Sequence, residues 1–344
     1  MTDSRVTLKL LSKHTGFDES TISRALRGDK TLSIRSENLQ KIIKKAEELG
    51  YVPNIVGRSL RSSRSHTLGL VLPSLQNHIH AQIVEGAHQV CVDQGYSLIM
   101  AYSESPDKQL EVIIRLIEKN RIEGLLALTF QNELRSSPHL DKFRIPVAAV
   151  NWSSAEFENW VVVNERQGAA TAVKHLIDLG HVRIAHIGGD LRRYNAAERH
   201  QGYVDALATA GIPYDPNLVA QSDYNSYQNG AKAMEDLLDK NAQPFSAVFA
   251  LSLLPAAGAL GVLRKRKIDV PSQMSIVAFH DGLIADVLSP TLTTVAFDLP
   301  AVGRLAAQGM IDVVEKKCKH FCKVIDGGRI VQRESTAALG HLQI

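Results

Sequence analysis

The chain has 344 residues, 44% of them hydrophobic, which is enough apolar material for two or three domains with cores of their own. No charged-then-apolar leader opens the sequence, and no apolar run approaches the roughly 18 residues that cross a bilayer, so a membrane protein is excluded and a cytoplasmic one is expected. The three cysteines, Cys91, Cys318 and Cys322, are too few for a disulfide framework and fit a reducing compartment.

The net charge of +3 is unevenly distributed along the chain. Residues 1–65 hold 13 Lys and Arg against 7 Asp and Glu, whereas residues 66–344 hold 26 against 29. A basic N-terminal fifth on a near-neutral remainder indicates a small head that binds a polyanion. A solvated basic tail would give the same surplus, but this segment is patterned rather than low in complexity.

Two short helices are expected on either side of Gly16. Thr7 can cap the first, and Asp18 can cap the second, in which apolar residues recur at the spacing of a buried face. A longer helix is expected over residues 34–49, with Ser33 as its cap. This pattern predicts a helix-turn-helix head, in which the second helix enters the DNA major groove with its N-terminal residues first. A generic three-helix miniature domain would show the same periodicity.

The polar face of the second helix is the candidate DNA-reading surface. Glu19 and Ser20 stand at its start, and Arg24 can reach a base or a phosphate. Because Glu19 is acidic and would face a polyanion, it should either read a cytosine amino group or act by exclusion. The predicted DNA contacts of the head are Thr7, Asp18, Glu19, Ser20, Thr21, Ser23 and Arg24.

A short hinge follows the head. Pro53 ends any continuing helix and Asn54 is a good cap for a new one, but "IVGRSL" supplies only about one and a half turns. A helix of that length is not stable alone in water. The segment is therefore a passive linker, or it folds only when a partner supplies the missing contacts.

From Thr67 onward, short β-rich runs alternate with amphipathic stretches. Strands are expected over 67–73, 96–101, 123–128 and 145–151, with helices over 80–95 and 107–121, and the same alternation repeats after residue 167. This order predicts an α/β fold with two parallel sheets, each flanked by helices and belonging to one of two similar lobes. Ligand binding is expected in a cleft between the lobes, at the carboxyl ends of the strands.

Motifs for catalysis or metal binding are weak. The sequence holds no Walker phosphate loop, GxGxxG spacing or GxSxG elbow, so we expect no enzyme and no cofactor. At helical spacing Cys318 and Cys322 would share a face as small buried side chains. His78 and His80 would lie on one side of an extended segment, but no third ligand is identifiable, so we expect no metal site.

Several longer motifs carry a family resemblance. "STISRALRG", "ELGYVPN", "RSLRSSRSHTLGLVLP", "HVRIAHIGG", "AERHQGY" and "VPSQMSIVAFHDG" resemble the LacI/GalR family of bacterial transcription regulators, and the similarity runs along nearly the whole chain. The resemblance implies a hinge that forms a helix in a dimer on operator DNA, with Leu60 wedged into the minor groove. It adds Asn54 and Arg58 to the expected DNA contacts. Gly57 stands where the family usually has Ala, so this hinge should be harder to order.

The resemblance also implies the domain organisation. The DNA-binding domain is expected over 1–50, the hinge helix and linker over 51–66, and a core like that of periplasmic sugar-binding proteins over 67–344. The chain should cross between the two lobes three times. The N-lobe is expected to hold about 67–163 and 294–322, and the C-lobe about 164–293 and 323–340.

Effector contacts are likewise implied by position. Arg199 matches its motif most closely, and its two-pronged donor face could hold a hydroxyl pair or a carboxylate, although an ion pair between the lobes is the alternative. Sugar-binding members typically show Asn-Asp where this chain has Ser252 and Leu253, and Asp where it has His280. An uncharged sugar and an anionic metabolite therefore both remain open. The expected contacts are Ile79, His80, Asn151, Arg193, Asn195, Arg199, Tyr224, Ser252 and His280.

The function that these observations predict is DNA-binding transcription regulation. The expected protein is a cytoplasmic, nucleoid-associated homodimer that binds double-stranded, pseudopalindromic operator DNA as a repressor and responds to a small-molecule effector. No membrane partner is expected. The alternative is a cytoplasmic or periplasmic-type small-molecule binding protein without a transcriptional role.

Overall fold

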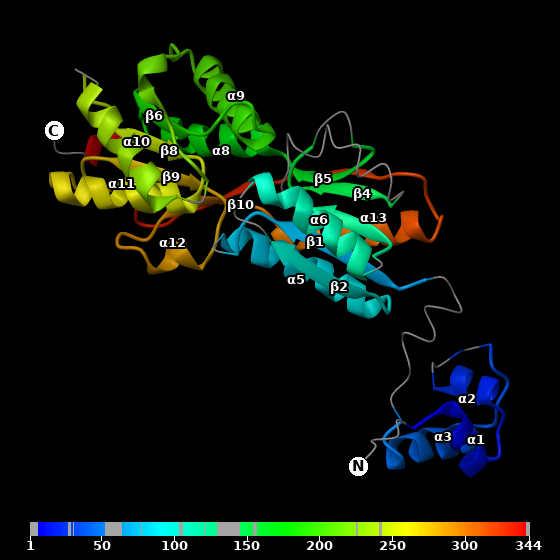
Figure 1. Cartoon of the computed structure of the whole chain (residues 1–344). Helices are drawn as coiled ribbons and strands as arrows, with labels where there is room; N and C mark the ends of the chain where they lie inside the picture. Colours follow the sequence, from blue (N-terminus) through cyan, green and yellow to red (C-terminus); the bar gives the residue numbers. More distant parts are fainter. Residues whose placement is uncertain are drawn as a thin grey trace. The chain divides into compact units, whose positions relative to one another are not determined.

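The computed structural model divides the chain into two compact units, Met1–Arg64 and Ser65–Ile344 (Figure 1). The predicted hinge contacts Asn54, Arg58 and Leu60 lie outside the residues that it describes, as does Gly57. The described residues are 6–26, 29, 31–51, 64–75, 77–102, 106–120, 122–128, 145–153, 157–224, 226–240 and 243–341.

The described residues of the first unit form three helices: α1 (Leu8–Thr15), α2 (Glu19–Ala25) and α3 (Ser36–Glu48). Leu11, Ile22 and Ile42, one from each helix, are fully buried against one another in its core. The predicted cap of the third helix is wrong. α3 begins two residues later than expected, and Arg35 stands at its N-cap without a side-chain hydrogen bond.

The N-lobe of the second unit contains a six-stranded parallel sheet in the order β11-β5-β4-β3-β1-β2. Alternate residues of β1 face opposite layers: Leu70 packs in the cluster that includes α5 and α13, whereas Val71 packs with α6. Helices therefore cover both faces, as a buried parallel sheet requires. The elements are β1 (Thr67–Leu72), β2 (Ser97–Tyr102), β3 (Gly124–Ala127), β4 (Val147–Val150), β5 (Asn159–Val163), β11 (Cys322–Ile325), α5 (His78–Asp93), α6 (Pro106–Asn120) and α13 (Leu299–Val314).

The C-lobe repeats this architecture with the strand order β12-β10-β9-β8-β6-β7, in which β12 alone runs antiparallel to its neighbour. Phe249 of β8 packs in the cluster with α8 and α9, and Val248 in the cluster with α10 and α11. The elements are α8 (Glu165–Asp178), β6 (Ile184–Gly188), α9 (Tyr194–Thr209), β7 (Val219–Gln221), α10 (Tyr227–Lys240), β8 (Ala247–Ala250), α11 (Leu253–Arg266), β9 (Ser275–Phe279), α12 (Leu283–Val287), β10 (Thr293–Ala296) and β12 (Arg329–Val331). The predicted α/β class with two parallel sheets is confirmed.

The chain passes from one lobe to the other three times: between β5 and α8, between β10 and α13, and between β11 and β12. Two of these segments are joined, because Asn164 Nδ2 donates to Asp326 Oδ1 over 2.8 Å. The expected lobe boundaries shift accordingly. β10 belongs to the C-lobe sheet and β11 to the N-lobe sheet, since each pairs with strands of that lobe.

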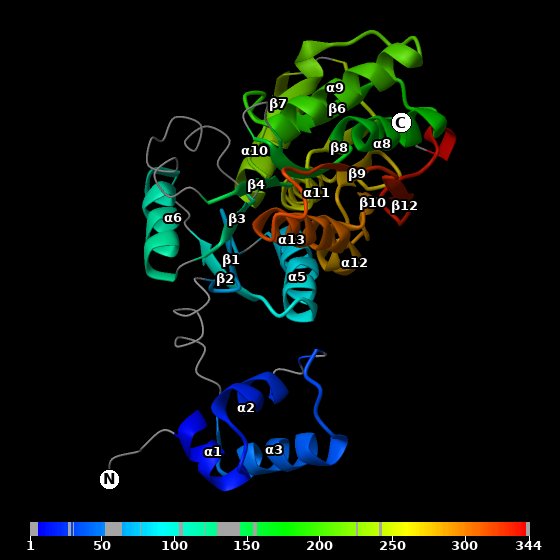
Figure 2. The ribbon, with the colours of Figure 1, turned by 90° about the vertical axis from the view of Figure 1, so that its right-hand side faces the viewer.

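Helices α5 and α13 come from distant parts of the sequence and pack side by side on the N-lobe sheet (Figure 2). Two glycines allow their backbones to approach closely. A Cβ at Gly86 would overlap the Pro300 carbonyl oxygen, and one at Gly303 would overlap the Ile83 carbonyl oxygen. The α5–α13 contact is therefore backbone against backbone at both positions.

Two local predictions about chemistry are wrong. Cys318 and Cys322 are both exposed, because α13 ends at Val314 and Cys322 begins a strand, so the two do not share a helical face. His78 and His80 lie in the first turn of α5 rather than in an extended segment. Among the described residues, no helix is long and apolar enough to span a membrane.

Candidate functional site

The start of α2 carries Glu19 and Ser20, both of them exposed. Asp18 precedes them and caps the helix: its carboxylate accepts from the Thr21 backbone N–H over 2.9 Å and from the Thr21 hydroxyl over 2.6 Å. These bonds hold the pKa of Asp18 well below its usual range. Asp18 and Thr21 thus fix the geometry of the helix end that presents Glu19 and Ser20.

Arg24 is tied to the segment that follows α2. Its Nε pairs with Asp29 Oδ2 at 2.8 Å, and its Nη2 donates to the Thr31 hydroxyl over 3.0 Å. The Arg24 side chain remains 38% exposed, so it can still approach a phosphate, but its charge is already offset by Asp29. Thr7 caps α1 as predicted, accepting from the Leu10 backbone N–H.

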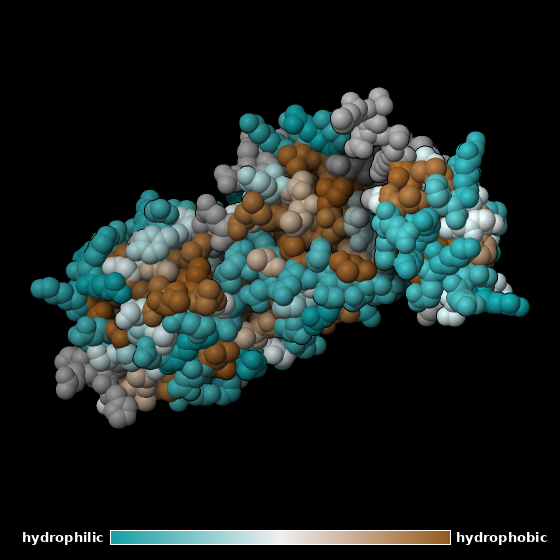
Figure 3. Space-filling model, turned by 90° about the horizontal axis from the view of Figure 1, so that it is seen from below, coloured by the Kyte–Doolittle hydropathy of each residue, from teal (hydrophilic) through white to brown (hydrophobic). Residues whose placement is uncertain are grey.

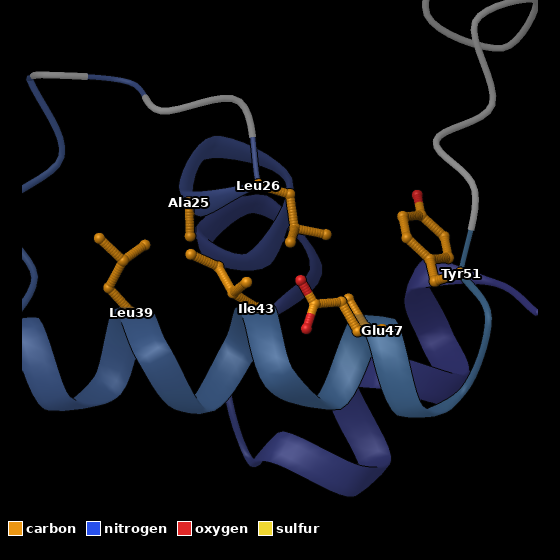
Figure 4. Close-up of a pocket in the computed structure, with 7 residues that line it drawn as sticks. Ala25, Leu26, Leu39, Ile43, Glu47 and Tyr51 are labelled. Carbon is orange, nitrogen blue, oxygen red and sulfur yellow. The ribbon is translucent and has the colours of Figure 1, made fainter.

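An apolar groove is lined by residues of both α2 and α3, beside the place where the two helices pack together (Figure 4). In this view the side chains of Ala25 and Leu26 point toward those of Leu39 and Ile43 on α3. α2 therefore turns its apolar side to the supporting helix and leaves its polar side to solvent. The lining residues are Ala25, Leu26, Leu39, Ile43, Ala46, Glu47 and Tyr51.

In the second unit, six polar residues from both lobes form one buried network, which we call the interlobe cluster. At its centre lies an ion pair in which Arg199 Nε contacts Glu165 Oε2 at 2.5 Å, with both side chains at most 1% exposed. Arg199 and Glu165 both belong to the C-lobe. The alternative role of Arg199, an ion pair between the lobes, is therefore not what the structure shows, because this ion pair lies within one lobe. The cluster consists of Asn151, Glu165, Asn195, Arg199, Tyr224 and His280.

Each nitrogen of the Arg199 guanidinium has an acceptor within the protein. Nε pairs with Glu165, Nη1 donates to the Leu251 carbonyl, and Nη2 contacts His280 Nε2 at 3.0 Å. The group also lies over aromatic rings, 3.9 Å from the centroid of Phe279 and 5.3 Å from that of Tyr224. Nη1 and Nη2, the two prongs of the predicted donor face, therefore each have one partner within the protein.

The contact with Arg199 assigns the tautomer of His280. A guanidinium can only donate, so His280 Nε2 must accept, and the ring proton lies on Nδ1. Burial lowers the pKa of His280 well below its usual range, and the charge of Arg199 lowers it further. The neutral ring thus holds an N–H donor at Nδ1, and this buried atom has no hydrogen-bond partner among the described residues.

Asn195 joins the two lobes. Its Nδ2 donates to the Asn151 carbonyl oxygen over 2.7 Å and to Glu165 Oε1 over 2.6 Å, so it connects the end of β4 with the ion pair. The Asn151 side-chain oxygen and the Tyr224 hydroxyl are both buried, and within the described part of the chain neither has a partner.

The other predicted effector contacts are distributed around this cluster. His80 is buried in the first turn of α5, where its Nδ1 contacts the Ser74 carbonyl at 2.9 Å, and Ile79 beside it is buried as well. Ser252 donates to the Tyr224 carbonyl over 2.9 Å. Arg193 is exposed at the N-cap of α9 and lies outside the buried network.

A second bridge between the lobes lies close to His80. His78 Nε2 and Gln82 Nε2, both of α5, donate to the Asp281 carbonyl over 3.2 and 3.3 Å. Burial lowers the pKa of both His78 and His80. The histidines on this side of the cluster are therefore neutral, like His280.

Sequence reasoning missed Glu165, the anion of the cluster. The residue follows a strand and opens α8, where an acidic side chain is expected to be an exposed partner of the helix dipole. In the structure Glu165 is buried, with Arg199 and Asn195 packed against its carboxylate. An acidic residue directly after the apolar run "WVVVN" was the signal that could have indicated it.

Comparisons with known proteins agree with this architecture. A family model described as a periplasmic binding protein-like domain matches residues 173–336. The ribose operon repressor of Haemophilus influenzae is 27% identical over 97% of this chain and 99% of its own length. The transcriptional repressor PurR of Photorhabdus laumondii is 28% identical over 96% of both chains. The chain belongs to the LacI/GalR family.

Solved structures of LacI/GalR regulators extend the match through the head. A complex of the transcriptional regulator CelR with cellobiose is 28% identical, with a TM-score of 0.74 over 96% of this chain and 100% of that one. The lac repressor dimer bound to operator and an anti-inducer gives a TM-score of 0.80 over 97% of this chain and 100% of its own, and at 21% identity it shows the fold alone. Transcription regulation is therefore confirmed over the alternative of a binding protein without a transcriptional role.

Proposed function

We propose that this LacI/GalR regulator is a cytoplasmic homodimeric repressor that reads operator DNA with α2 and binds a small-molecule effector at the interlobe cluster. One observation carries the DNA-binding part: Glu19 and Ser20 are exposed at the start of a capped helix whose opposite side is packed on α3. Two relatives are named as repressors, and the CelR structure holds cellobiose, which supports repression and a small-molecule effector.

Effector control follows from the way the lobes are joined. The buried contacts Asn195–Asn151 and His78–Asp281 hold the lobes together, and the chain crosses between them at Asn164 and Asp326. A ligand that changes these contacts shifts the arrangement of the lobes, and the DNA affinity changes with it. By linkage, operator DNA must change the affinity for the effector by the same factor. Control is by binding, and no step of turnover is proposed.

Exposed apolar side chains support the dimer. Leu283 and Val287 of α12 are 75% and 72% exposed. Figure 3 views the molecule from the side on which α12 lies in Figure 1, and it shows hydrophobic patches between hydrophilic side chains on this lobe. Patches of this kind mark sites of association. We propose a second copy of the chain as the partner, because a symmetric dimer presents two heads to a pseudopalindrome.

The test of the proposed function compares two proteins on operator DNA. Intact protein should bind its operator sequence tightly, and a chain of residues 65–344, which form a compact unit, should not bind it. Binding is measured by fluorescence anisotropy, and thermal melting confirms that the shortened chain is folded. Equal operator binding by the two proteins would contradict the proposal.

Substitutions at the start of α2 should change which half-site is preferred. We expect Glu19→Gln and Ser20→Ala each to change discrimination at one base pair by about 1–3 kcal/mol, the value of a specific base contact. The measurement is the affinity for a set of half-site variants at fixed salt. Glu37→Gln on α3 removes the same charge from another exposed position and serves as the control. An unchanged order of half-site preference in both α2 variants would remove these residues from the reading surface.

A further inference from the structure

The charges and unpartnered atoms of the interlobe cluster indicate which class of effector fits. This inference rests on the proposed effector site. We infer that the effector is an uncharged molecule that accepts a hydrogen bond from His280 Nδ1 and offers a donor to the Asn151 side-chain oxygen. Hydroxyl, carbonyl and amide groups meet these requirements, whereas a phosphate or carboxylate at this position does not.

The first step is the charge balance. Arg199 is the cation of the cluster, and Glu165 offsets its charge in direct contact, with both side chains at most 1% exposed. An anionic ligand would have to compete with a carboxylate that is already in place, and it would lie close to it. Burying an anion without a free cation is strongly unfavourable.

The second step is the state of the surrounding titratable groups. His280, His78 and His80 are neutral for the reasons given above, and burial raises the pKa of Tyr224, so its phenol stays protonated. Arg193 carries the remaining positive charge near Tyr224, but its side chain is exposed and its field is screened by solvent. None of these side chains supplies a buried positive charge for an anion.

The third step is the pattern of donors and acceptors. His280 Nδ1 offers one N–H, the Asn151 side-chain oxygen offers lone pairs, and the Tyr224 hydroxyl can either donate or accept. All three atoms are buried without partners among the described residues, a state that costs free energy for each atom. A neutral ligand that accepts from His280 and offers donors to the oxygen atoms recovers this cost.

One test requires no knowledge of the effector. Intact protein is melted in a constant background of potassium chloride, with and without inorganic phosphate at a concentration too low for the general stabilisation that phosphate salts give to proteins. We expect the same melting temperature with and without phosphate, and we expect Glu165→Gln, which leaves Arg199 uncompensated, to melt higher when phosphate is present. Arg193→Gln, which removes the exposed cation, is the control and should behave as the wild type does. A wild-type protein that phosphate stabilises, with or without Arg193, would overturn the inference.

A second test uses matched pairs of ligands and reports through DNA. Operator binding is measured with ribose or ribose 5-phosphate, glucose or glucose 6-phosphate, and adenosine or its monophosphate. Where either member of a pair changes operator binding, we expect the uncharged member to change it. A response to the phosphorylated member alone would overturn the inference. Failure to bind operator both without ligand and with every ligand tested would instead contradict the proposed function, so the two failures are distinguishable.

If no ligand of these pairs changes operator binding, the inference is tested on His280 itself. Nitrogen chemical shifts of the imidazole should show the neutral ring with its proton on Nδ1 at neutral pH, and a cationic ring would overturn the inference. For any effector found, His280→Gln retains an acceptor for Arg199 and loses the Nδ1 donor, so the affinity should fall roughly tenfold. His280→Asn retains a donor near the Nδ1 position and should lose less.

Discussion

Replacing Arg199 with alanine is expected to lower the free energy of unfolding by about 3–5 kcal/mol, because the change leaves the fully buried Glu165 carboxylate without its cation. The effector response should be lost as well, since His280 loses the donor that fixes its tautomer. Denaturant melting of the intact protein, together with operator anisotropy, measures both effects. Arg199 is thus expected to act as a positioning residue as well as a candidate effector contact.

A double substitution separates charge from packing. Arg199→Met keeps a side chain of similar length beside Phe279 and Tyr224 but leaves the Glu165 carboxylate unpaired, so adding Glu165→Gln to it should restore stability. If the double variant is no more stable than Arg199→Met, the unpaired carboxylate is not the source of the loss.

A methyl group at Gly303 should also be strongly destabilising. Gly303→Ala would place a Cβ against the Ile83 carbonyl oxygen, and backbone atoms cannot rotate away as a flexible side chain can. α5 and α13 would have to move apart, which we expect to cost about 1–3 kcal/mol. Chemical denaturation monitored by circular dichroism measures the loss.

Gly340→Ala is the matched control, because no atom lies within 4 Å of the position that its Cβ would take. It should change the stability by no more than a few tenths of a kcal/mol, the range of neutral surface changes. Equal stability of Gly303→Ala and Gly340→Ala would show that the two N-lobe helices are not held by backbone contact at this position.

The strands that sequence patterning predicted are those with long apolar runs between neighbouring helices. The sequence analysis missed five strands: β5, β7, β10, β11 and β12. β5 pairs with β11, which lies more than 150 residues further along the chain, and β12 runs antiparallel to β10. Partners so distant leave no local alternation to detect. The prediction of a helix around Cys318 failed for a related reason, since that segment leads into β11.

The residues of the candidate site were predictable by position, but their partnerships were not. The motif around Arg199 drew attention to it, yet Glu165 lies far away in the sequence and neutralises it only in the fold. His280 was noted as a departure from the family pattern, but its tautomer depends on a donor that only the packed structure reveals. Charge compensation between distant residues is a tertiary property, and composition does not report it.

The placement of α13 and β11 has a consequence for biosynthesis. The N-lobe is completed by residues 299–325, so α5 can pack on β1 and β2 early but lacks its helix partner α13 until those residues are synthesised. The head, by contrast, is complete after about fifty residues. The N-lobe sheet therefore stays incomplete, with the α13-binding face of α5 exposed, while the C-lobe strands β6 to β10 are synthesised. Chains that terminate early between these points should be the ones most dependent on chaperones.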